Sequence, residues 1–317
     1  MTPSRLFLFL LSFVAFAGCS AGDEDQRIVL GFSQIGSESA WRIANTESIR
    51  SAAATSNIDL RFSDAGQKQE KQIAALRGFI ADKVDVIAFA PVVATGWEPV
   101  LREARAAGIP VILTDRSVSA DPSLYAGFLG SDFVEEGRKA ARWVVGRFPD
   151  TTQAVNIVQL EGTPGADPAI ERRRGFEEII ARYPHMRIIR SHTADFERHR
   201  GEAVMGEILA SEKQKIHVLF AHNDDMALGA IKAIEAAGRS PGRDILIVSI
   251  DAVRAAFEAM IAGKLNATVE CNPLMGPQLM TSVTEVVSGR PIPRRHYVEE
   301  AVFTQETARQ HIQTRKY

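Results

Sequence analysis

The stretch of residues 84–117 constrains the fold of this chain more than any other part of the sequence. It opens with an apolar run, residues 84–90, that is short and rich in β-formers, as is typical of a strand buried on both faces. Pro91 ends this run, apolar residues then recur at helical spacing up to Gly108, and a second apolar run covers residues 111–113. The pattern predicts a strand–helix–strand unit with parallel strands and a right-handed crossover.

The same alternation of strand and helix recurs along the rest of the chain. Apolar runs predict further strands at residues 28–32, 58–62, 154–160, 186–190, 218–221, 245–250, 267–270 and 297–303. Helical patterns separate most of these runs, which predicts an α/β fold of two doubly wound parallel-sheet lobes joined by a hinge. We expect a first lobe, a second lobe, a segment that returns to the first lobe and a C-terminal segment at the hinge or second lobe, at residues 27–130, 131–271, 272–290 and 291–317.

The first residues have the pattern of a secretory signal. Arg5 precedes an apolar core that ends in small residues and is too short for an ordinary membrane-spanning helix. Residues 16–19, Phe-Ala-Gly-Cys, resemble a bacterial lipobox, in which the cysteine is lipidated and becomes the new amino terminus. We expect a signal peptide at residues 1–18, lipidation of Cys19 and a lipidated tether at residues 19–26. Cleavage to a soluble form is the alternative, because a lipobox usually has leucine where Phe16 stands.

Charge and motif content argue against several functional classes. The formal net charge of −2 gives no electrostatic reason to expect nucleic-acid binding. The histidines form no ligand pair at helical spacing, and two cysteines support neither a zinc site nor a disulfide framework. Cys271 is interpreted as a buried structural thiol. The chain has no GxGxxG, P-loop or GxSxG motif, so we expect no cofactor, no metal site and no catalytic residues.

Polar side chains follow several predicted strands at their carboxyl ends, where open α/β sheets bind ligands. They are Glu38, Trp41, Arg42, Asp115 and Arg116 in the first lobe and Arg172, Asn223 and Asp251 in the second. Asp, Asn and Arg each present two hydrogen-bonding atoms in one plane, which matches two adjacent hydroxyls of a sugar, and Trp offers a flat apolar face. Taken singly, each residue also has a structural interpretation, such as core packing for Trp41, a solvated arginine run around Arg172 and a local ion pair of Asp115 with Arg116.

Longer motifs resemble a known family. Residues 31–39, GFSQIGSES, followed by Trp41 and Arg42, resemble the start of the ribose/galactose-type periplasmic sugar-binding proteins, which have the type I periplasmic binding protein fold. APVVATGWEPVL at residues 90–101, Asp-Arg-Ser at residues 115–117 and AHNDDM at residues 221–226 are similar to the subgroup that binds galactofuranose for an ABC importer. The matches run in order through essentially the whole mature chain.

The resemblance implies two lobes with three hinge crossings and a monosaccharide held between them. By position, it assigns the ligand contacts to Glu38, Ser39, Ala40, Trp41, Arg42, Asp115 and Arg116 of the first lobe and to Arg172, Asn223 and Asp251 of the second. It implies a monomer, periplasmic or tethered to a membrane as a lipoprotein, that delivers the sugar to an ABC permease in the cytoplasmic membrane. Ala40 departs from the subgroup, which has glycine there, and Val155 and His217 stand near the places of its two second-lobe cysteines, so no disulfide is expected.

Three alternatives remain open from the sequence. A signalling module of the same fold would report its closed form to a membrane sensor instead of delivering sugar. The effector core of a LacI-like repressor shares the fold, but the export signal and the lack of a helix–turn–helix before residue 28 argue against it. An α/β enzyme that modifies sugars would need paired carboxylates at a spacing that the sequence does not establish.

Overall fold

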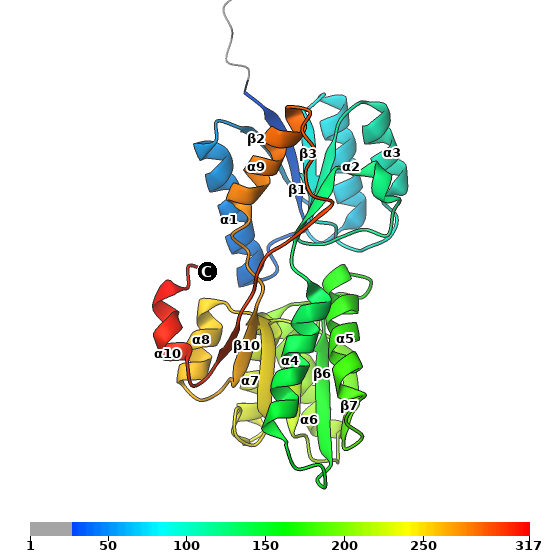
Figure 1. The fold of residues 1–317 in the computed structure, drawn as a ribbon. Coiled ribbons are helices and arrows are strands. Elements are labelled where there is room, and N and C mark those ends of the chain that lie inside the picture. The colour runs from blue at the N-terminus through cyan, green and yellow to red at the C-terminus, as the bar shows by residue number, and fades with distance from the viewer. Residues whose placement is uncertain (1–26) are drawn as a thin grey trace, which may run out of the picture.

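The computed structural model describes residues 27–317 and places them in two α/β lobes, one above the other in Figure 1. The predicted signal peptide, Cys19 and the tether at residues 19–26 lie outside the described residues. Each lobe is built around a six-stranded sheet. The doubly wound two-lobed fold predicted from the alternating strands and helices is therefore confirmed.

The first sheet has the strand order β11-β5-β4-β3-β1-β2, and all its strand pairs are parallel. Its strands are β1 (Val29–Gln34), β2 (Asp59–Asp64), β3 (Val86–Phe89), β4 (Val111–Thr114), β5 (Gly127–Gly130) and β11 (Arg295–Tyr297). Helices α1 (Ala40–Thr55), α2 (Gln69–Ala81), α3 (Glu98–Ala106) and α9 (Gly276–Val287) cover it, with the 3-10 turn η1 (Pro122–Leu124). Every residue of β3 and β4 is buried, as the continuous apolar runs at residues 84–90 and 111–113 predict.

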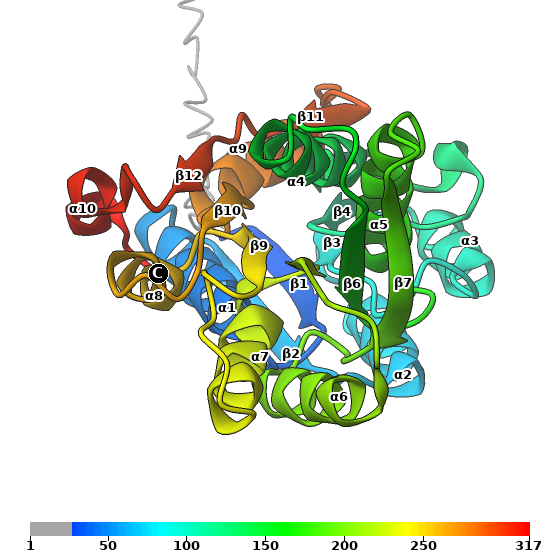
Figure 2. The ribbon, with the colours of Figure 1, turned by 90° about the horizontal axis from the view of Figure 1, so that it is seen from below.

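The second sheet has the order β12-β10-β9-β8-β6-β7. Its strands are β6 (Val155–Glu161), β7 (Met186–Thr193), β8 (Val218–Ala221), β9 (Leu246–Asp251), β10 (Ala267–Glu270) and β12 (Val302–Thr304). The remaining helices pack here: α4 (Phe133–Arg147), α5 (Asp167–Ile180), α6 (Arg198–Ser211), α7 (Asp224–Ala236), α8 (Arg254–Ile261), α10 (Ala308–His311) and η2 (Ile312–Thr314). In Figure 2, α4 and α5 lie on one side of this sheet and α6 and α7 on the other.

The backbones of α4 and α5 touch at two glycines. A Cβ atom at Gly137 of α4 would collide with the carbonyl oxygen of Arg172, and one at Gly175 of α5 would collide with the carbonyl oxygen of Val134. Any side chain at either position would push the helices apart. This contact fixes the part of α5 that carries Arg172 against the part of α4 that carries Glu136.

The chain passes between the lobes three times, as Figure 1 shows. The crossings follow β5, follow β10, and join β11 to β12. The prediction of one strand at residues 297–303 is therefore wrong. Its ends lie in different sheets, with β11 parallel to β5 and β12 antiparallel to β10, and the residues between them must span the hinge. Residues 295–297 accordingly belong to the first sheet, not to the hinge or second lobe.

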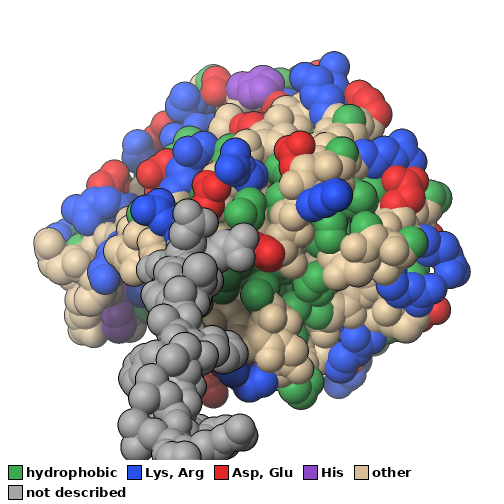
Figure 3. Space-filling view, turned by 90° about the horizontal axis from the view of Figure 1, so that it is seen from above, with side chains coloured by type: hydrophobic (Ala, Val, Ile, Leu, Met, Phe, Trp, Pro, Cys, Tyr) green, Lys and Arg blue, Asp and Glu red, His purple; other side chains and the backbone are tan. Residues whose placement is uncertain are grey.

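The surface carries charges of both signs. On the face shown in Figure 3, basic and acidic side chains are interspersed, which fits the net charge near zero. Within residues 27–317, no helix is long and apolar enough to cross a membrane.

Candidate functional site

A cavity lies between the two lobes, beside the hinge. It contains about 290 Å³ of space not filled by atoms, part of it open to solvent. Eight of the ten residues predicted to contact a ligand line it: Glu38, Ser39, Trp41, Arg42, Arg116, Arg172, Asn223 and Asp251. The strand ends of both sheets therefore bring the predicted residues together, although they are spread over more than 200 positions of the chain.

The first turn of α1 forms much of the first-lobe wall. Ser39 caps this helix, since its Oγ accepts a hydrogen bond from the Arg42 amide at 3.1 Å. Arg42 is 3% exposed and its guanidinium contacts Glu38 Oε1 at 3.1 Å and Asp115 Oδ2 at 2.7 Å. Burial opposes the charge of Arg42, but Asp115 and Glu38 outweigh it and raise the pKa of this guanidinium. Arg42 also lies over the Trp41 ring, 4.6 Å from its centroid.

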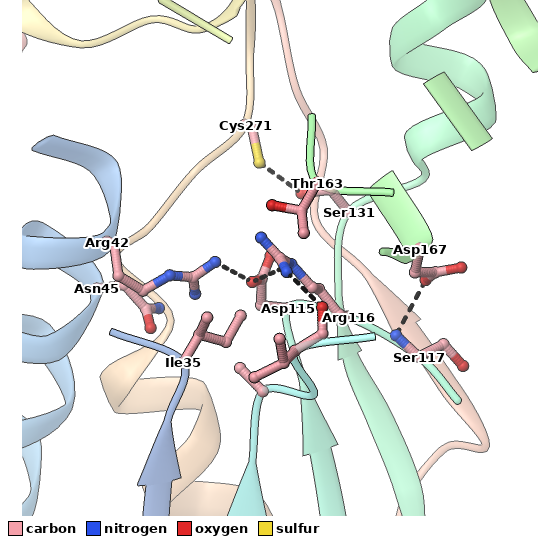
Figure 4. A network of polar contacts seen from close by, with 12 residues as sticks. Ile35, Arg42, Asn45, Asp115, Arg116, Ser117, Ser131, Thr163, Asp167 and Cys271 are labelled. Atoms are coloured by element: carbon pink, nitrogen blue, oxygen red, sulfur yellow. Dashed lines mark hydrogen bonds and ion pairs between the residues drawn. The ribbon is translucent and has the colours of Figure 1, made fainter. Parts of the chain in front are cut away.

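Asp115 and Arg116 follow β4 directly, and Figure 4 shows them facing Arg42. Asp115 has a φ of +60°, a conformation that Asp tolerates better than most residues. Arg116 donates to the carbonyl oxygen of Val92 at 2.9 Å, and its Nε has no hydrogen-bond acceptor within residues 27–317. Burial, together with the charge of Arg42, lowers the pKa of Arg116 to about 10. Arg116 therefore keeps a buried donor that a ligand could use.

Arg172 on α5 is the central residue of the second-lobe wall. Its Nε contacts Glu136 Oε2 at 2.7 Å, its Nη1 donates to the His222 carbonyl at 2.6 Å, and its Nη2 lies 3.8 Å from Asp251 Oδ1. Burial raises the pKa of Asp251 well above its usual range, although Arg172 partly offsets this. Arg173 and Arg174 point outward, with side chains 47% and 63% exposed. One arginine of the run thus enters the cleft.

Asn223 is held by the helix that follows it. It caps α7, with Oδ1 accepting from the Met226 amide at 3.0 Å, and its Nδ2 donates to the Phe196 carbonyl at 3.1 Å. The two bonds fix the plane of the amide beside the cavity. Asp224 and Asp225 follow Asn223 in the first turn of α7, where acidic residues favour the helix N-terminus. Asp225 also accepts a hydrogen bond from the Ala40 amide of the first lobe.

Ala40 and Asp115 do not line the cavity, although both were predicted to contact the ligand. The Ala40 amide instead donates to Asp225 Oδ2 at 2.9 Å, across the cleft. Asp115 lies behind Arg42 and acts on the cavity through that side chain. Further hydrogen bonds join the lobes: the Ser117 amide donates to Asp167 Oδ2 at 2.9 Å, the Ala94 amide donates to the Gly165 carbonyl at 2.9 Å, and Gln67 Nε2 donates to Glu197 Oε1 at 3.0 Å.

Three lining residues were missed: Pro168, Phe196 and Cys271. Phe196 lies under two guanidinium groups, 5.2 Å from that of Arg116 and 6.0 Å from that of Arg172. It sits in the polar segment at residues 192–199, where a single aromatic residue was the only signal. Cys271 is a buried thiol, as interpreted, and its carbonyl accepts the Trp41 Nε1 hydrogen bond at 2.6 Å.

The charges at the cavity nearly cancel. Three arginines, Arg42, Arg116 and Arg172, meet four acidic residues: Glu38, Asp115, Glu136 and Asp251. Burial raises the pKa of one of these acids, Asp251, which reduces the negative charge further. Such a site suits a neutral ligand with many hydroxyl groups, because each charged group already has a partner and still presents hydrogen-bonding atoms.

The chain matches one known protein family along most of its length. The family model described as "Periplasmic binding protein domain" matches residues 30–291. The chain belongs to the periplasmic binding protein family. The resemblance to the ribose/galactose type is confirmed, because the galactofuranose-binding protein YtfQ of Escherichia coli (strain K12) is 42% identical over 293 residues, 91% of this chain and 92% of that protein. A periplasmic location is the expectation for this family.

Solved structures agree with this assignment. A Mycobacterium smegmatis protein in complex with β-D-fucofuranose has 52% sequence identity and a TM-score of 0.89, over 92% of this chain and 95% of that one. The arabinose ABC transporter component from Shewanella sp. ANA-3, bound to α- and β-L-arabinofuranose, has 45% identity and a TM-score of 0.87, over 91% and 95%. Members of this family bind solutes and catalyse no reaction, so the chain is a binding protein and not an enzyme.

Proposed function

We propose that this chain is the substrate-binding subunit of a sugar ABC importer and that it captures a monosaccharide in its furanose ring form, similar to galactofuranose. The observation that carries the proposal is the cavity between the lobes, lined by planar groups of balanced charge. The relatives support the ring form, since one binds galactofuranose and two are solved with fucofuranose and arabinofuranose. The permease in the cytoplasmic membrane is the implied partner.

In this proposal, each lobe contributes part of the sugar site. Arg42 and Arg116 donate hydrogen bonds from the first lobe, and Arg172, Asn223 and Asp251 pair with hydroxyls from the second. Trp41 provides an apolar face for the C–H side of the ring. A sugar that contacts both walls favours the closed form because it binds that form better than the open one.

Trp41 gives a direct optical test. Of the three tryptophans, Trp41 lines the cavity, whereas Trp97 and Trp143 do not. We expect D-galactose, D-fucose or L-arabinose to change the intrinsic fluorescence in a saturable way. The change should disappear in Trp41→Phe, which keeps an aromatic ring but loses the 2.6 Å hydrogen bond to the Cys271 carbonyl.

The control for this titration is Trp143→Phe, which alters a tryptophan of α4 away from the cavity. It should keep the sugar-dependent change. A fluorescence change that survives in Trp41→Phe and is lost in Trp143→Phe would contradict the assigned site. No response to any of the three sugars, together with no response to ribose, fructose or glucose, would contradict the sugar-binding function.

The proposal includes a lipid anchor and a monomeric state. Because the lipobox-like sequence ends at Cys19, we expect the mature protein to remain with the membrane fraction and Cys19→Ser to release it. Cys271→Ser is the matched control, since this second cysteine is buried at the hinge, and it should leave the protein membrane-bound. Equal fractionation of wild type and Cys19→Ser would refute lipidation, and release of both proteins into the soluble fraction would favour simple signal cleavage.

A further inference from the structure

The three hinge crossings meet at one carboxyl group. Glu300 lies on the third crossing, between β11 and β12. Its Oε1 accepts from Ser131 Oγ on the first crossing at 2.5 Å and from the Asn272 amide on the second at 3.2 Å. Lys139 of α4 donates to the Glu300 backbone carbonyl at 2.6 Å. A single side chain thus ties together the segments that must move when the lobes open.

Glu300 has two titratable neighbours at this point. A carboxylate oxygen of Glu136, a carboxylate oxygen of Glu300 and Cys271 Sγ all lie within 4.8 Å of one another. Glu136 and Cys271 are buried, and Cys271 Sγ lies 3.4 Å from Ser131 Oγ. A dashed line marks this contact between Cys271 and Ser131 in Figure 4. Glu136 Oε2 is bonded to Arg172, whereas Glu136 Oε1 is buried with no hydrogen-bond donor within residues 27–317.

The charges around Glu300 favour its neutral form. Arg172 reaches this cluster only through Glu136 and also approaches Asp251 at 3.8 Å, and Lys139 contacts the Glu300 backbone rather than its carboxylate. If Glu136 and Glu300 were both ionised here, the nearby positive charge would be too small to stabilise the two buried carboxylates. Burial and, after it, the neighbouring Glu136 together raise the pKa of Glu300 to about 9.

A proton on Glu300 completes the hydrogen bonding of the cluster. Because both donors bond to Glu300 Oε1, the proton belongs on Oε2, from which it can be donated to Glu136. Glu136 Oε1 then has the donor that it otherwise lacks, and Glu136 Oε2 remains bonded to Arg172 at 2.7 Å. The contacts lead without a break from the three crossings to an arginine of the cleft.

We propose that Glu300 is a positioning residue that clasps the hinge: its neutral carboxyl joins the three crossings and donates a hydrogen bond to Glu136, which holds Arg172 in place for the ligand. The link to ligand affinity rests on the proposed sugar-binding function, whereas the clasp itself does not. When Glu300 loses its proton at alkaline pH, a hydrogen bond between the two carboxyls becomes a repulsion. The closed hinge and the orientation of Arg172 then weaken together.

The sign of the pH dependence follows from the raised pKa. A carboxyl that holds its proton more tightly in the folded state stabilises that state at low pH, and this stabilisation is lost as the pH rises towards 9. If only the form with neutral Glu300 binds well, about a quarter of the protein remains competent at pH 9.5, so the affinity for sugar falls about fourfold.

The test compares wild type with Glu300→Gln, Glu300→Ala and the exposed control Glu299→Gln. The glutamine amide can accept from Ser131 and Asn272 and donate to Glu136, but it does not titrate. The melting temperature of the sugar-free protein is measured from pH 7 to pH 10, and the affinity for D-galactose at pH 7.5 and pH 9.5. We expect the melting temperature of wild type and Glu299→Gln to fall as the pH rises from 7 to about 9, and their affinity to fall above about pH 8.5. Both quantities should stay nearly constant in Glu300→Gln and be lower at every pH in Glu300→Ala.

Three results would overturn the proposal. Glu300→Gln could follow the pH profile of wild type, or Glu300→Ala could melt and bind as wild type does at pH 7.5. Zn²⁺ alone, titrated at pH 7.5, could bind wild type and fail to bind Glu300→Gln, which would make the cluster a cation site instead of a proton site. If D-galactose does not bind at all, the melting profiles of the sugar-free protein still decide whether the clasp exists.

Discussion

Arg172→Ala is expected to abolish sugar binding. The guanidinium is 3% exposed and bonded to Glu136 and to the His222 carbonyl, and its loss leaves two buried acids, Glu136 and Asp251, without their cation. Removing one partner of a buried charge pair at a binding site costs about 2–5 kcal/mol, or from about 30-fold to several thousandfold in affinity. The free energy of unfolding should also fall by about 3–5 kcal/mol. Calorimetric titration with sugar and urea unfolding measure the two effects.

Two further variants make the Arg172 prediction decisive. Arg172→Lys keeps the positive charge but loses the planar fork, so it should fold and still bind more than tenfold more weakly. Arg173→Ala removes the next residue, whose side chain is 47% exposed and paired with Glu161 at 3.4 Å, and it should change neither affinity nor stability by more than about 0.5 kcal/mol. Normal affinity in Arg172→Lys would show that the guanidinium of Arg172 does not hold the sugar.

Asp115→Asn is expected to weaken sugar binding although Asp115 does not line the cavity. Its carboxylate lies 2.7 Å from Arg42 Nη2, and this ion pair fixes the guanidinium that faces the cleft. Asparagine is the chosen replacement because it tolerates the φ of +60° at this position, which alanine would not. The loss of a buried ion-pair contact of this length costs about 1.5–3 kcal/mol, as for a polar contact to a charged group, so the affinity should fall about 10-fold to 150-fold.

The matched control for this prediction is Asp59→Asn. Asp59 also pairs with an arginine at 2.7 Å, but the side chains of this pair, Arg61 and Asp59, are 60% and 38% exposed. Solvent screens such a pair, and we expect no measurable change in sugar affinity. If Asp115→Asn binds sugar as tightly as Asp59→Asn does, Arg42 needs no ion-pair partner at residue 115 and the proposed role of Asp115 is wrong.

Most of the fold and much of the site could be predicted because both depend on local patterns. Continuous apolar runs such as β3 and β4 mark buried parallel strands, and the polar residues that follow parallel strands must meet at one edge of the sheet. Trp41 and Arg172 lie at the cavity for this reason. The same logic cannot tell a wall residue from the residue behind it: Asp115 and Ala40 do not line the cavity and contact Arg42 and Asp225, and their predicted contact with the ligand stays a prediction.

The residues that were missed depend on long-range geometry. Phe196 reaches the cavity from a loop because two guanidinium groups lie over its ring, and no period in the sequence marks such a position. β11 and β12 are three residues each and join different sheets, so the short segment at residues 297–303 was predicted as one strand. The hinge cluster of Glu136, Cys271 and Glu300 combines residues from three distant segments, and only the fold brings them within 4.8 Å.

Isothermal titration calorimetry with D-galactose tests the central claim most directly. In solution this sugar is mostly a pyranose, with a small furanose fraction that re-forms slowly. A site that selects the furanose should therefore bind tightly, but saturate only after many galactose molecules have been added per protein. Saturation at one galactose per protein would contradict the furanose selectivity, and the absence of heat with galactose, fucose and arabinose would contradict sugar binding itself.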